Sequence, residues 1–456
     1  MLLTPEMTGI ASPDPLKNAF KIKNAAHAGR QGSMPISVDH QMWHHWWNMP
    51  SSAQRRALYI HIPFCRKRCS FCNFFENGAQ PQRVSRYVNA LCEQLDRASN
   101  TALVQSRPFD TVYVGGGTPT DMSADDLYQL GQMIRKFPTV DGAEITLEGR
   151  LNGFDDGKWN SALESGFNRF SFGVQSFNTQ VRQAAGRLDE RELLLERLHG
   201  LSLHETASIV VDLMFGLPGQ TDTIWQQDLA DVIASGVHGV DLYQLINLPG
   251  SRLEQAEGKG KPIQGFAAGH RADSQQRAEM YRYGANTLEQ ANWQRLSSCH
   301  WRRDTRERSV YNSLAKSGIE ILPFGSGAGG NIHGYGMMNK RDLSSWYDAQ
   351  ANENNSLSTL PVRVPAMFMS PNPDAALDAA FKRGLDAGEL PFDSLTVAMV
   401  EHLIPLFEAW QQHGLAKLSK RALLLTMAGR YWNVNLQTGL FLYLQENVMQ
   451  NLSEAS

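Results

Sequence analysis

Three of the five cysteines in this 456-residue chain lie close together, in the segment FCRKRCSFCNFF at residues 64–75. Cys65, Cys69 and Cys72 follow the spacing CxxxCxxC, and no second cluster of cysteines follows to complete a four-ligand zinc site. Three thiolates can hold a [4Fe–4S] cluster while one iron stays free to bind a substrate. The spacing therefore predicts an iron–sulfur site with one open position. A zinc site completed by a histidine such as His61 is the alternative.

The composition limits the class of partner. The formal charge of −3 and the pI near 6.5 lack the basic character typical of nucleic-acid binders. No apolar run reaches the length of a membrane span, and the N-terminus has no basic start followed by an apolar run. The isolated Cys92 and Cys299 beside one dense cluster are typical of a reducing compartment. We therefore expect a cytoplasmic protein with neither nucleic acid nor membrane as partner.

Short apolar runs alternate with helical patterns from residue 57 onward, which is the arrangement of β-α units that build a parallel sheet. The expected strands are ALYIHIP, FDTVYV, AEITLE, RFSFGVQ, SIVVDLMF and GVDLYQLIN. Six units are too few for a closed eight-stranded barrel, so the predicted fold is α/β, a partial (β/α)6 TIM-like barrel. Enzymes of this kind place their chemistry at the carboxyl ends of the strands, and the cysteines follow the first strand directly.

Four parts are expected along the chain. Residues 1–55 lack clear periodicity and are predicted to be an N-terminal extension that wraps the barrel. Residues 56–340 form the core barrel with accessory strands, and the polar residues 341–390 form a linker. Residues 391–456 form a small helical or winged-helix-like domain, whose balanced charges favour a lid or cap over a DNA-binding module.

Further segments accompany the cysteine motif: YIHIPFC before it, GGGTPT at 115–120, SFGVQSF at 171–177 and DLMFGLPGQT at 212–221. Together they resemble the radical S-adenosylmethionine (SAM) enzymes, in the coproporphyrinogen dehydrogenase branch. The resemblance covers residues 57–335, and the tail is similar to that branch's small C-terminal domain. It implies two cofactors, a [4Fe–4S] cluster and SAM, with the amino and carboxylate groups of SAM on the fourth iron.

Strand-end residues of this chain suit SAM chemically. Glu148 ends the predicted third strand, Gln175 ends the fourth and Asp212 sits in the fifth, so they could converge on one pocket. A carboxylate suits the ammonium or ribose hydroxyls of SAM, and Arg187 can offer a fork to its carboxylate. The resemblance implies SAM-binding roles for Tyr59, Phe71, Gly116, Gly117, Thr118, Glu148, Gln175, Arg187 and Asp212.

Within the branch, CNFFENGAQ, HWRRDTRERSVYN and PFGSGAGGNIHGYG resemble the ChuW/HutW group of anaerobic heme-degrading methyltransferases, the anaerobilin synthases. The resemblance implies that SAM is cleaved homolytically, that a carbon radical attacks heme with methyl transfer, and that the macrocycle opens to release iron and a linear tetrapyrrole. A heme chaperone and an oxygen-independent coproporphyrinogen III dehydrogenase are the alternatives. The dehydrogenase carries a further cysteine where this chain has Phe74, which disfavours decarboxylation. The chaperones share that phenylalanine, so Phe74 does not distinguish them.

Heme would present two propionates and an iron to the protein. Four arginines lie within seven residues of HWRRDTRERSVYN, and Arg302 and Arg306 are the predicted propionate ligands. Because acids are interleaved with them, a self-paired solvated strip is an equal alternative. His333, in a Gly-rich loop expected near the barrel mouth, is the first candidate for an iron ligand. The other candidates are His44, His45, Cys299 and His300, the last two expected to end a strand.

The cluster loop itself carries three consecutive basic residues, Arg66, Lys67 and Arg68. They could raise the potential of the cluster, or dock an acidic electron donor such as a reduced flavodoxin-like protein. A solvated loop without such a role is the alternative.

Overall fold

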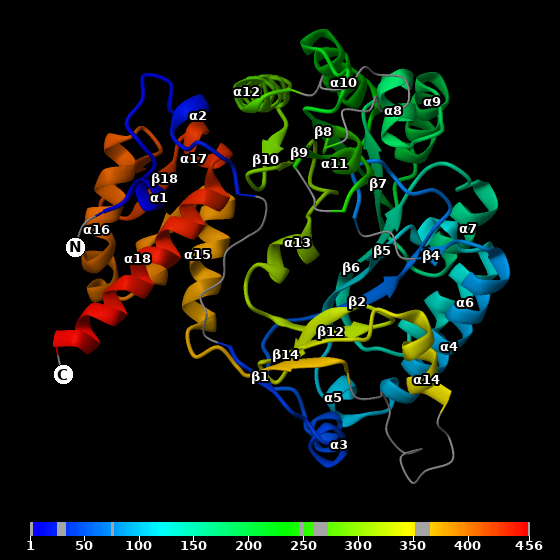
Figure 1. Ribbon diagram of the computed structural model, residues 1–456. Helices are drawn as coiled ribbons and strands as arrows, with labels where there is room; N and C mark the ends of the chain where they lie inside the picture. The colour runs from blue at the N-terminus through cyan, green and yellow to red at the C-terminus, as the bar shows by residue number, and fades with distance from the viewer. Residues whose placement is uncertain are drawn as a thin grey trace.

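The computed structural model describes residues 3–24, 33–73, 77–246, 250–258, 272–351 and 365–454. Figure 1 shows a large unit built around a twisted sheet, beside a smaller unit of C-terminal helices drawn in orange and red. The first residues of the chain, drawn in blue, lie against the smaller unit. Over the ranges described, no helix combines the length and apolar character needed to cross a membrane.

Nine strands of the described chain form the main sheet, in the order β10-β11-β9-β8-β7-β6-β5-β2-β12. Six adjacent strands are parallel and confirm the six predicted ones: β2 (Arg56–Ile62), β5 (Phe109–Gly116), β6 (Thr139–Gly149), β7 (Arg169–Gln175), β8 (Ser208–Phe215) and β9 (Gly239–Gln244). Strand β12 (Glu320–Phe324) adds a seventh parallel strand beside β2. The edge strands β10 and β12 do not pair, so the barrel is open, as predicted.

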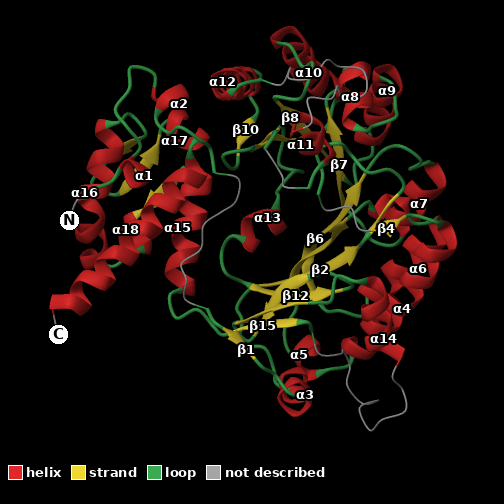
Figure 2. Ribbon diagram, in the orientation of Figure 1, coloured by secondary structure: helices red, strands yellow, loops and turns green. Residues whose placement is uncertain are grey.

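Helices connect the parallel strands and lie around the outside of the sheet (Figure 2). In chain order they are α4 (Pro81–Ser99), α6 (Ala124–Ile134), α7 (Asp156–Glu164), α9 (Arg191–Ser202), α10 (Asp222–Ser235) and α12 (Ser274–Gln290). Strands covered on both faces carry nearly continuous apolar runs, because neither face meets water. This is why SIVVDLMF of β8 reads as a strand although it does not alternate.

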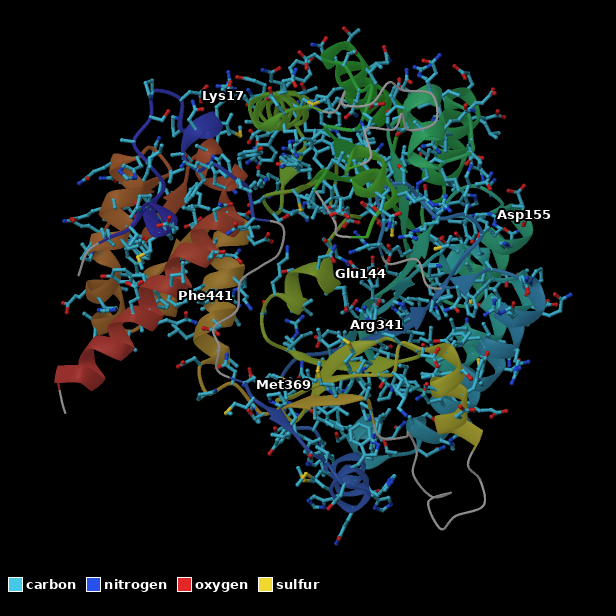
Figure 3. The ribbon with its side chains drawn as sticks, in the orientation of Figure 1. Lys17, Glu144, Asp155, Arg341, Met369 and Phe441 are labelled. Carbon is cyan, nitrogen blue, oxygen red and sulfur yellow. The ribbon has the colours of Figure 1, made fainter. Side chains whose placement is uncertain are left out.

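A short helix, α13 (Val310–Ala315), covers the inner side of the sheet and contacts β2 and β5. Its first two N–H groups donate to the carboxylate of Glu144, a residue of β6 labelled in Figure 3, at 3.0 and 3.1 Å. The ring of Tyr311 stacks on Tyr113 at 4.5 Å and on Tyr59 at 6.2 Å. The helix thus closes part of the open barrel from inside.

The amino ends of β2 and β12 are covered by a second, four-stranded sheet and by helix α3 (His40–Asn48). The sheet comprises β1 (Pro35–Ile36), β15 (Met367–Met369), β14 (Tyr335–Met338) and β13 (Gly329–Ile332). Trp43, Trp46 and Trp47 of α3 are buried, and Trp46 stacks on Tyr335 at 4.4 Å. The aromatic string MWHHWW of the extension is therefore a helix whose tryptophans pack against this layer.

The smaller unit combines four helices with a three-stranded antiparallel sheet of order β16-β18-β17. Its elements are α15 (Ala375–Ala387), β16 (Glu389–Pro391), α16 (Val397–Gln412), β17 (Ala416–Leu418), β18 (Ala422–Leu425), α17 (Met427–Tyr431) and α18 (Asn433–Glu454). Helices α14 (Leu343–Ala351) and α15 both fall within residues 341–390, the stretch expected to be a linker. One side of α15 buries Phe381 and Leu385 against the unit, which explains why this stretch is helical.

The first residues of the chain fasten the two units together. Helices α1 (Pro5–Thr8) and α2 (Pro15–Asn18) contact α18 and α17, and the indole N–H of Trp410 donates to the Met7 carbonyl at 2.8 Å. On the barrel side, Lys17 (labelled in Figure 3) forms an ion pair with Glu279 of α12 at 2.5 Å. Residues 3–24 of the extension therefore lie between the C-terminal unit and one barrel helix, while α3 lies under the barrel.

Candidate active site

The cysteine loop begins at the carboxyl end of β2, where the sequence predicted it. Cys65 and Cys69 are buried and Cys72 is half-buried. The hydroxyl of Thr118 donates to Sγ of Cys65 at 3.3 Å, and Nη2 of Arg150 donates to Sγ of Cys69 at 3.3 Å. Burial raises the pKa of the Cys65 thiol, and the hydrogen bond from Thr118 offsets part of that rise.

Neighbouring elements fix the backbone of this loop. The amide of Ser70 donates to the Ala185 carbonyl at 3.1 Å, and the Ser70 carbonyl accepts from the amide of Leu253 at 2.8 Å. Gly186, at φ +90°, approaches the backbone of Cys69 so closely that a Cβ there would lie 3.1 Å from its Cα. The loop is therefore held between α8 (Thr179–Ala185) and α11 (Arg252–Gly258) before any cofactor binds.

The glycine-rich turn after β5 supports the cysteine loop directly. The amides of Gly117 and Thr118 donate to the carbonyls of Ile62 and Phe64 at 2.8 and 2.7 Å. A Cβ at Gly117 would lie 2.4 Å from the Phe64 carbonyl oxygen, which no side chain tolerates. The turn thus both orients Thr118 toward Cys65 and exposes side-chain-free backbone to a ligand.

Charged side chains converge inside the barrel below this turn. Glu148 accepts from the amide of Gly116 and from the hydroxyl of Tyr113, both at 3.4 Å. Burial raises the pKa of Glu148. Burial, together with the neighbouring carboxylates of Asp241 and Glu148, raises the pKa of Asp212 to about 7. A cationic ligand near these acids would be stabilised by them and would hold both ionised.

Arg187 and Gln175 meet above Gly173, where a Cβ would lie 2.9 Å from Nη2 of Arg187 and 2.7 Å from Nε2 of Gln175. Gln175 has a positive φ of 72°, a conformation rare for residues other than glycine and typical of functional sites. Arg187 is buried, and its Nε and Nη1 have no hydrogen-bond partner within the described structure. Such unsatisfied donors are costly unless a ligand accepts from them.

The remaining predicted positions lie at the same end of the barrel. Tyr59 of β2 shares a hydrogen bond with Nδ1 of His61 at 2.8 Å, and burial lowers the pKa of His61 to about 4. Phe71 packs on a separate apolar cluster with Leu217 and Leu253, beside the cysteine loop. Sequence reasoning missed Arg150, although it follows Glu148 by two residues at the end of β6, the position where catalytic groups were expected.

Three comparisons with known proteins agree with this geometry. The sequence profile described as "Radical SAM superfamily" matches residues 59–232. Anaerobilin synthase of Escherichia coli O157:H7 is 35% identical to this chain over 426 residues, which cover 92% of each protein. The chain belongs to the radical SAM enzymes. The heme chaperone HemW of Bacillus subtilis (strain 168) is 29% identical over 65% of this chain and 76% of its own.

The solved structure of coproporphyrinogen III oxidase (HemN) from Escherichia coli superposes on this radical SAM enzyme with a TM-score of 0.73. The match covers 89% of this chain and 94% of the other at 21% identity, and it confirms the α/β fold with an open barrel and additional units. Membership of the family implies a [4Fe–4S] cluster and SAM, in place of the zinc alternative.

The residues present fit both cofactors. The three cysteines offer the soft thiolate ligands that iron–sulfur clusters require, each on a loop held in place by its neighbours. The two unpartnered Arg187 donors offer the fork that a carboxylate accepts, and Gly117 leaves backbone open beside it. We propose that Arg187 binds the carboxylate of SAM and that Glu148 or Asp212 faces its positive groups.

An Arg187→Met substitution tests this role. Because a charge-assisted hydrogen bond contributes about 1.5–3 kcal/mol, we expect SAM to bind roughly 10- to 100-fold more weakly. The iron content and the visible spectrum of the cluster should be unchanged, since Arg187 forms no hydrogen bond to a cysteine sulfur in the described structure. Equilibrium titration with SAM measures the change. Unaltered SAM affinity would contradict the assignment.

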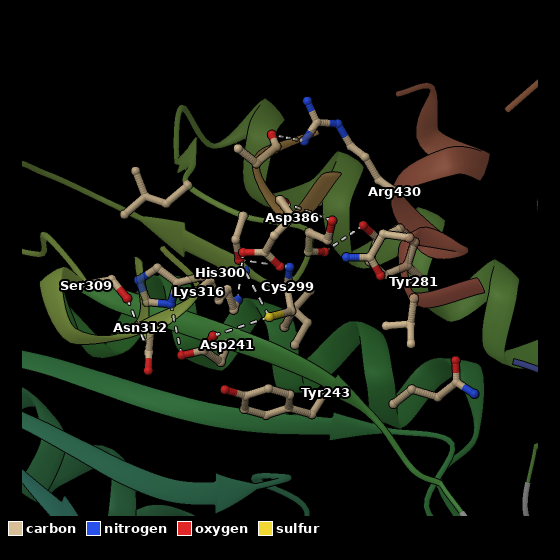
Figure 4. A pocket seen from close by; sticks show the side chains of 18 of the residues that line it. Asp241, Tyr243, Tyr281, Cys299, His300, Ser309, Asn312, Lys316, Asp386 and Arg430 are labelled. Atoms are coloured by element: carbon tan, nitrogen blue, oxygen red, sulfur yellow. Dashed lines mark hydrogen bonds and ion pairs between the residues drawn. The ribbon is translucent and has the colours of Figure 1, made fainter. Parts of the chain in front are cut away.

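A cavity of about 540 Å³ lies between the barrel and the C-terminal unit, within the usual range for ligand pockets. Figure 4 shows its walls. Asp241 and Tyr243 come from β9, His300 begins β11 (His300–Arg302) and Cys299 directly precedes it, and Asp386 and Arg430 come from the C-terminal unit. Tyr243 also interacts electrostatically with Asp212, so the cavity adjoins the acids of the barrel interior.

His300 is not free to bind iron, contrary to its place among the candidate ligands. It begins strand β11 rather than ending a strand, and both ring nitrogens are occupied: Nδ1 lies 2.9 Å from Asp241 and Nε2 lies 3.1 Å from Glu307. These acids raise the pKa of His300 to about 9, so the ring is an imidazolium at neutral pH. Cys299 does line the cavity, with Sγ 3.8 Å from Oδ1 of Asp241.

The prediction that His333 lies near the barrel mouth is wrong. Its amide donates to Glu320, the first residue of β12, and its Nε2 lies 3.0 Å from the Trp46 carbonyl of α3. Both contacts belong to the amino ends of the strands, at the opposite end of the barrel from the cysteines. His44 and His45 are exposed on the same helix α3 and do not line the cavity.

Arg302 and Arg306 are not brought to the site either. Arg302 donates to the side chain of Gln294 and to the Glu307 carbonyl, and it pairs in register with Gly239 at the amino end of β9. Arg306 is exposed and contacts Asp304 at 3.4 Å. The self-paired alternative holds for Arg306, which Asp304 partners, whereas Arg302 donates to Gln294 outside the segment and to a backbone carbonyl.

The acid of the same segment, Glu307, is instead the centre of a buried network. It accepts from Nε and Nη2 of Arg169 at 3.0 Å, from the hydroxyl of Ser208 at 2.8 Å and from His300 at 3.1 Å. Two cations and a hydroxyl thus surround one carboxylate, and they hold its pKa well below the usual range. The network ties the segment after β11 to β7 and β8 and so fixes the cavity wall.

We expect the protonated His300 to make stability depend on pH. A pKa raised from 6.5 to about 9 stabilises the folded state fully below pH 6.5, and the stabilisation is lost as pH rises through 9. The loss is of the order of 3 kcal/mol. Denaturant unfolding from pH 6.5 to 9.5 should show this decline in wild type and lack it in His300→Gln. Parallel pH profiles of the two proteins would contradict it.

Proposed function

We propose that the enzyme opens the heme macrocycle in the absence of oxygen, by SAM-dependent radical methyl transfer, and releases iron and a linear tetrapyrrole. The extent of the match to anaerobilin synthase carries this proposal, since it spans 92% of this chain, whereas the match to the heme chaperone of Bacillus subtilis spans 65%. The match to anaerobilin synthase therefore covers more of this chain than the match to the chaperone does. The large cavity beside the barrel acids also supports it.

The residues of this chain would form two adjoining sites, one for the cofactors at the barrel mouth and one for the substrate in the cavity. Bound at the cysteines, the cluster and SAM would supply a carbon radical at the barrel mouth. Arg187 would hold the SAM carboxylate, and the backbone at Gly116 and Gly117 would let it approach. Tyr243, between the barrel acids and the cavity, would separate the cofactor from the substrate until both are placed. Helix α13 and the C-terminal unit would exclude water from the substrate.

A reduced flavodoxin-like protein is the proposed electron donor. Within the cluster loop, Arg66 pairs with Asp121 at 2.5 Å and Arg68 donates to the Gly250 carbonyl at 2.8 Å. Lys67 is exposed between them. The donor surface is therefore proposed to centre on Lys67. A cytoplasmic location also stays a prediction.

The proposal is tested by anaerobic incubation of the reconstituted enzyme with heme, SAM and a reductant. We expect the Soret band to disappear, and mass spectrometry to show an open tetrapyrrole carrying one added methyl group. Omission of SAM is the control. An intact Soret band with heme still bound would favour the chaperone alternative. Decarboxylation of coproporphyrinogen III would favour the dehydrogenase, whose diagnostic position, Phe74, lies outside the described residues.

A further inference from the structure

The walls of the cavity are basic although the chain as a whole carries a formal charge of −3. Five lysines and arginines line the cavity against two aspartates, an excess of three positive groups before His300 is counted. The basic residues are Lys23, Arg308, Lys316, Arg383 and Arg430, and the acids are Asp241 and Asp386. Positive charge concentrated in one cavity of an acidic protein favours an anionic ligand.

Three of these cations already have partners inside the protein. Nζ of Lys316 lies 2.7 Å from Asp386, Nη2 of Arg308 donates to the Gly142 carbonyl at 2.9 Å, and Nη1 of Arg430 donates to the Ala387 carbonyl at 2.7 Å. The two others, Lys23 and Arg383, have neither an acidic partner nor a hydrogen bond within the described structure. Two cations thus remain available to a ligand.

Lys23 belongs to the N-terminal segment, and its neighbour fixes its place. The amide and side chain of Asn24 bond to Asn435 and Thr438 of α18 at 3.0 and 2.9 Å. The ammonium of Lys23 lies 3.9 Å from the centre of the Tyr431 ring. Burial lowers the pKa of Lys23 to about 7, and a carboxylate beside it would raise that pKa again.

Arg383 lies on α15, the wall that the C-terminal unit contributes, one turn before Asp386. Its side chain is exposed, so its guanidinium is accessible to a ligand that enters the cavity from solvent. Apolar side chains also line the cavity, among them Phe215, Leu242 and Tyr281, each at most 2% exposed. An aromatic ring system with acidic groups at its edge matches such a lining.

We propose that Lys23 and Arg383 bind the two carboxylates of a porphyrin-type dicarboxylic acid and so set the orientation in which its ring enters the cavity. The proposal rests on the proposed function, whose substrate is such a molecule. It assigns substrate recognition to two segments outside the barrel sheet. Lys23 and Arg383 take the role that the sequence analysis predicted for Arg302 and Arg306.

Binding of protoporphyrin IX and of its dimethyl ester to the holoenzyme, without reductant, tests the proposal. Neither probe contains iron, so axial ligation does not contribute. We expect wild type to bind the diacid more tightly than the ester. Lys23→Met and Arg383→Met should each weaken diacid binding about tenfold and leave the affinity for the ester unchanged. The matched control is Arg306→Met, which removes an exposed guanidinium that does not line the cavity.

The ratio of the two dissociation constants decides the outcome. The ratio is the dissociation constant of the ester divided by that of the diacid. If it falls toward one when Lys23→Met and Arg383→Met are combined, but not in Arg306→Met, the assignment is supported. If it is equal in wild type and all variants, the assignment is overturned. Thermal unfolding of each variant shows whether the fold is retained. The readout is separate from turnover: if wild type bound the diacid through both cations yet left heme intact, the proposed function would fail while this site would stand.

Discussion

Replacement of Cys69 by alanine is expected to abolish formation of 5′-deoxyadenosine from SAM. Two thiolates cannot hold a four-iron cube, and Cys69 is the cysteine whose sulfur accepts from Arg150 in the buried part of the loop. Iron and sulfide analysis after anaerobic reconstitution should show loss of the cluster, and chromatography should show no cleavage product. The fall in activity should reach the detection limit, rather than the partial loss expected for Arg187→Met.

Cys92→Ala is the matched control, because Cys92 is also buried but lies on α4, whose packing face covers the outside of the sheet. Its variant should keep full iron content and full SAM cleavage. Retained 5′-deoxyadenosine formation in Cys69→Ala would contradict the assignment of the three-cysteine site.

Replacement of Glu307 by alanine should cause the largest loss of stability among single substitutions in the barrel. The side chain is completely buried, and its removal leaves the guanidinium of Arg169 and the imidazolium of His300 uncompensated in the interior. Breaking a buried pair in this way costs about 3–5 kcal/mol. Urea or guanidinium unfolding measures the change in the free energy of unfolding.

The neighbouring acid Asp304 supplies the comparison, because it is only half-buried and pairs with two partly exposed arginines. Its replacement by alanine should cost less than about 1 kcal/mol, as is typical of exposed pairs. Equal losses for Glu307→Ala and Asp304→Ala would show that the network does not stabilise the fold as described.

The parts of the structure that could be predicted from the sequence are those determined by residues close together in the chain. All six runs predicted as parallel strands are strands, because a strand covered on both faces must be apolar along its length. The convergence of Glu148, Gln175 and Asp212 followed from one geometric rule, that the carboxyl ends of parallel strands meet at one rim. Arg150 obeys the same rule and could have been found by it.

Side chains outside this repeat could not be placed from the sequence. A glycine-rich loop beside His333 does not indicate which end of the barrel it occupies, and β13, the strand that leads to His333, has only four residues. Nor does the pattern of HWRRDTRERSVYN reveal that its acid Glu307 is buried while Arg306 is exposed, because that depends on contacts with β7 and β8. Nothing in the sequence around Lys23 indicates that its side chain lines the cavity.

The contact between Met7 and Trp410 joins residues 403 positions apart in the chain. During synthesis on the ribosome, the segment around Met7 can therefore dock only after Trp410 has emerged. The barrel strands are complete long before that moment, since β12 ends at Phe324. The wall that carries Lys23 is consequently the last to be built, and a nascent chain bearing a finished sheet has no closed chamber in which to retain a substrate.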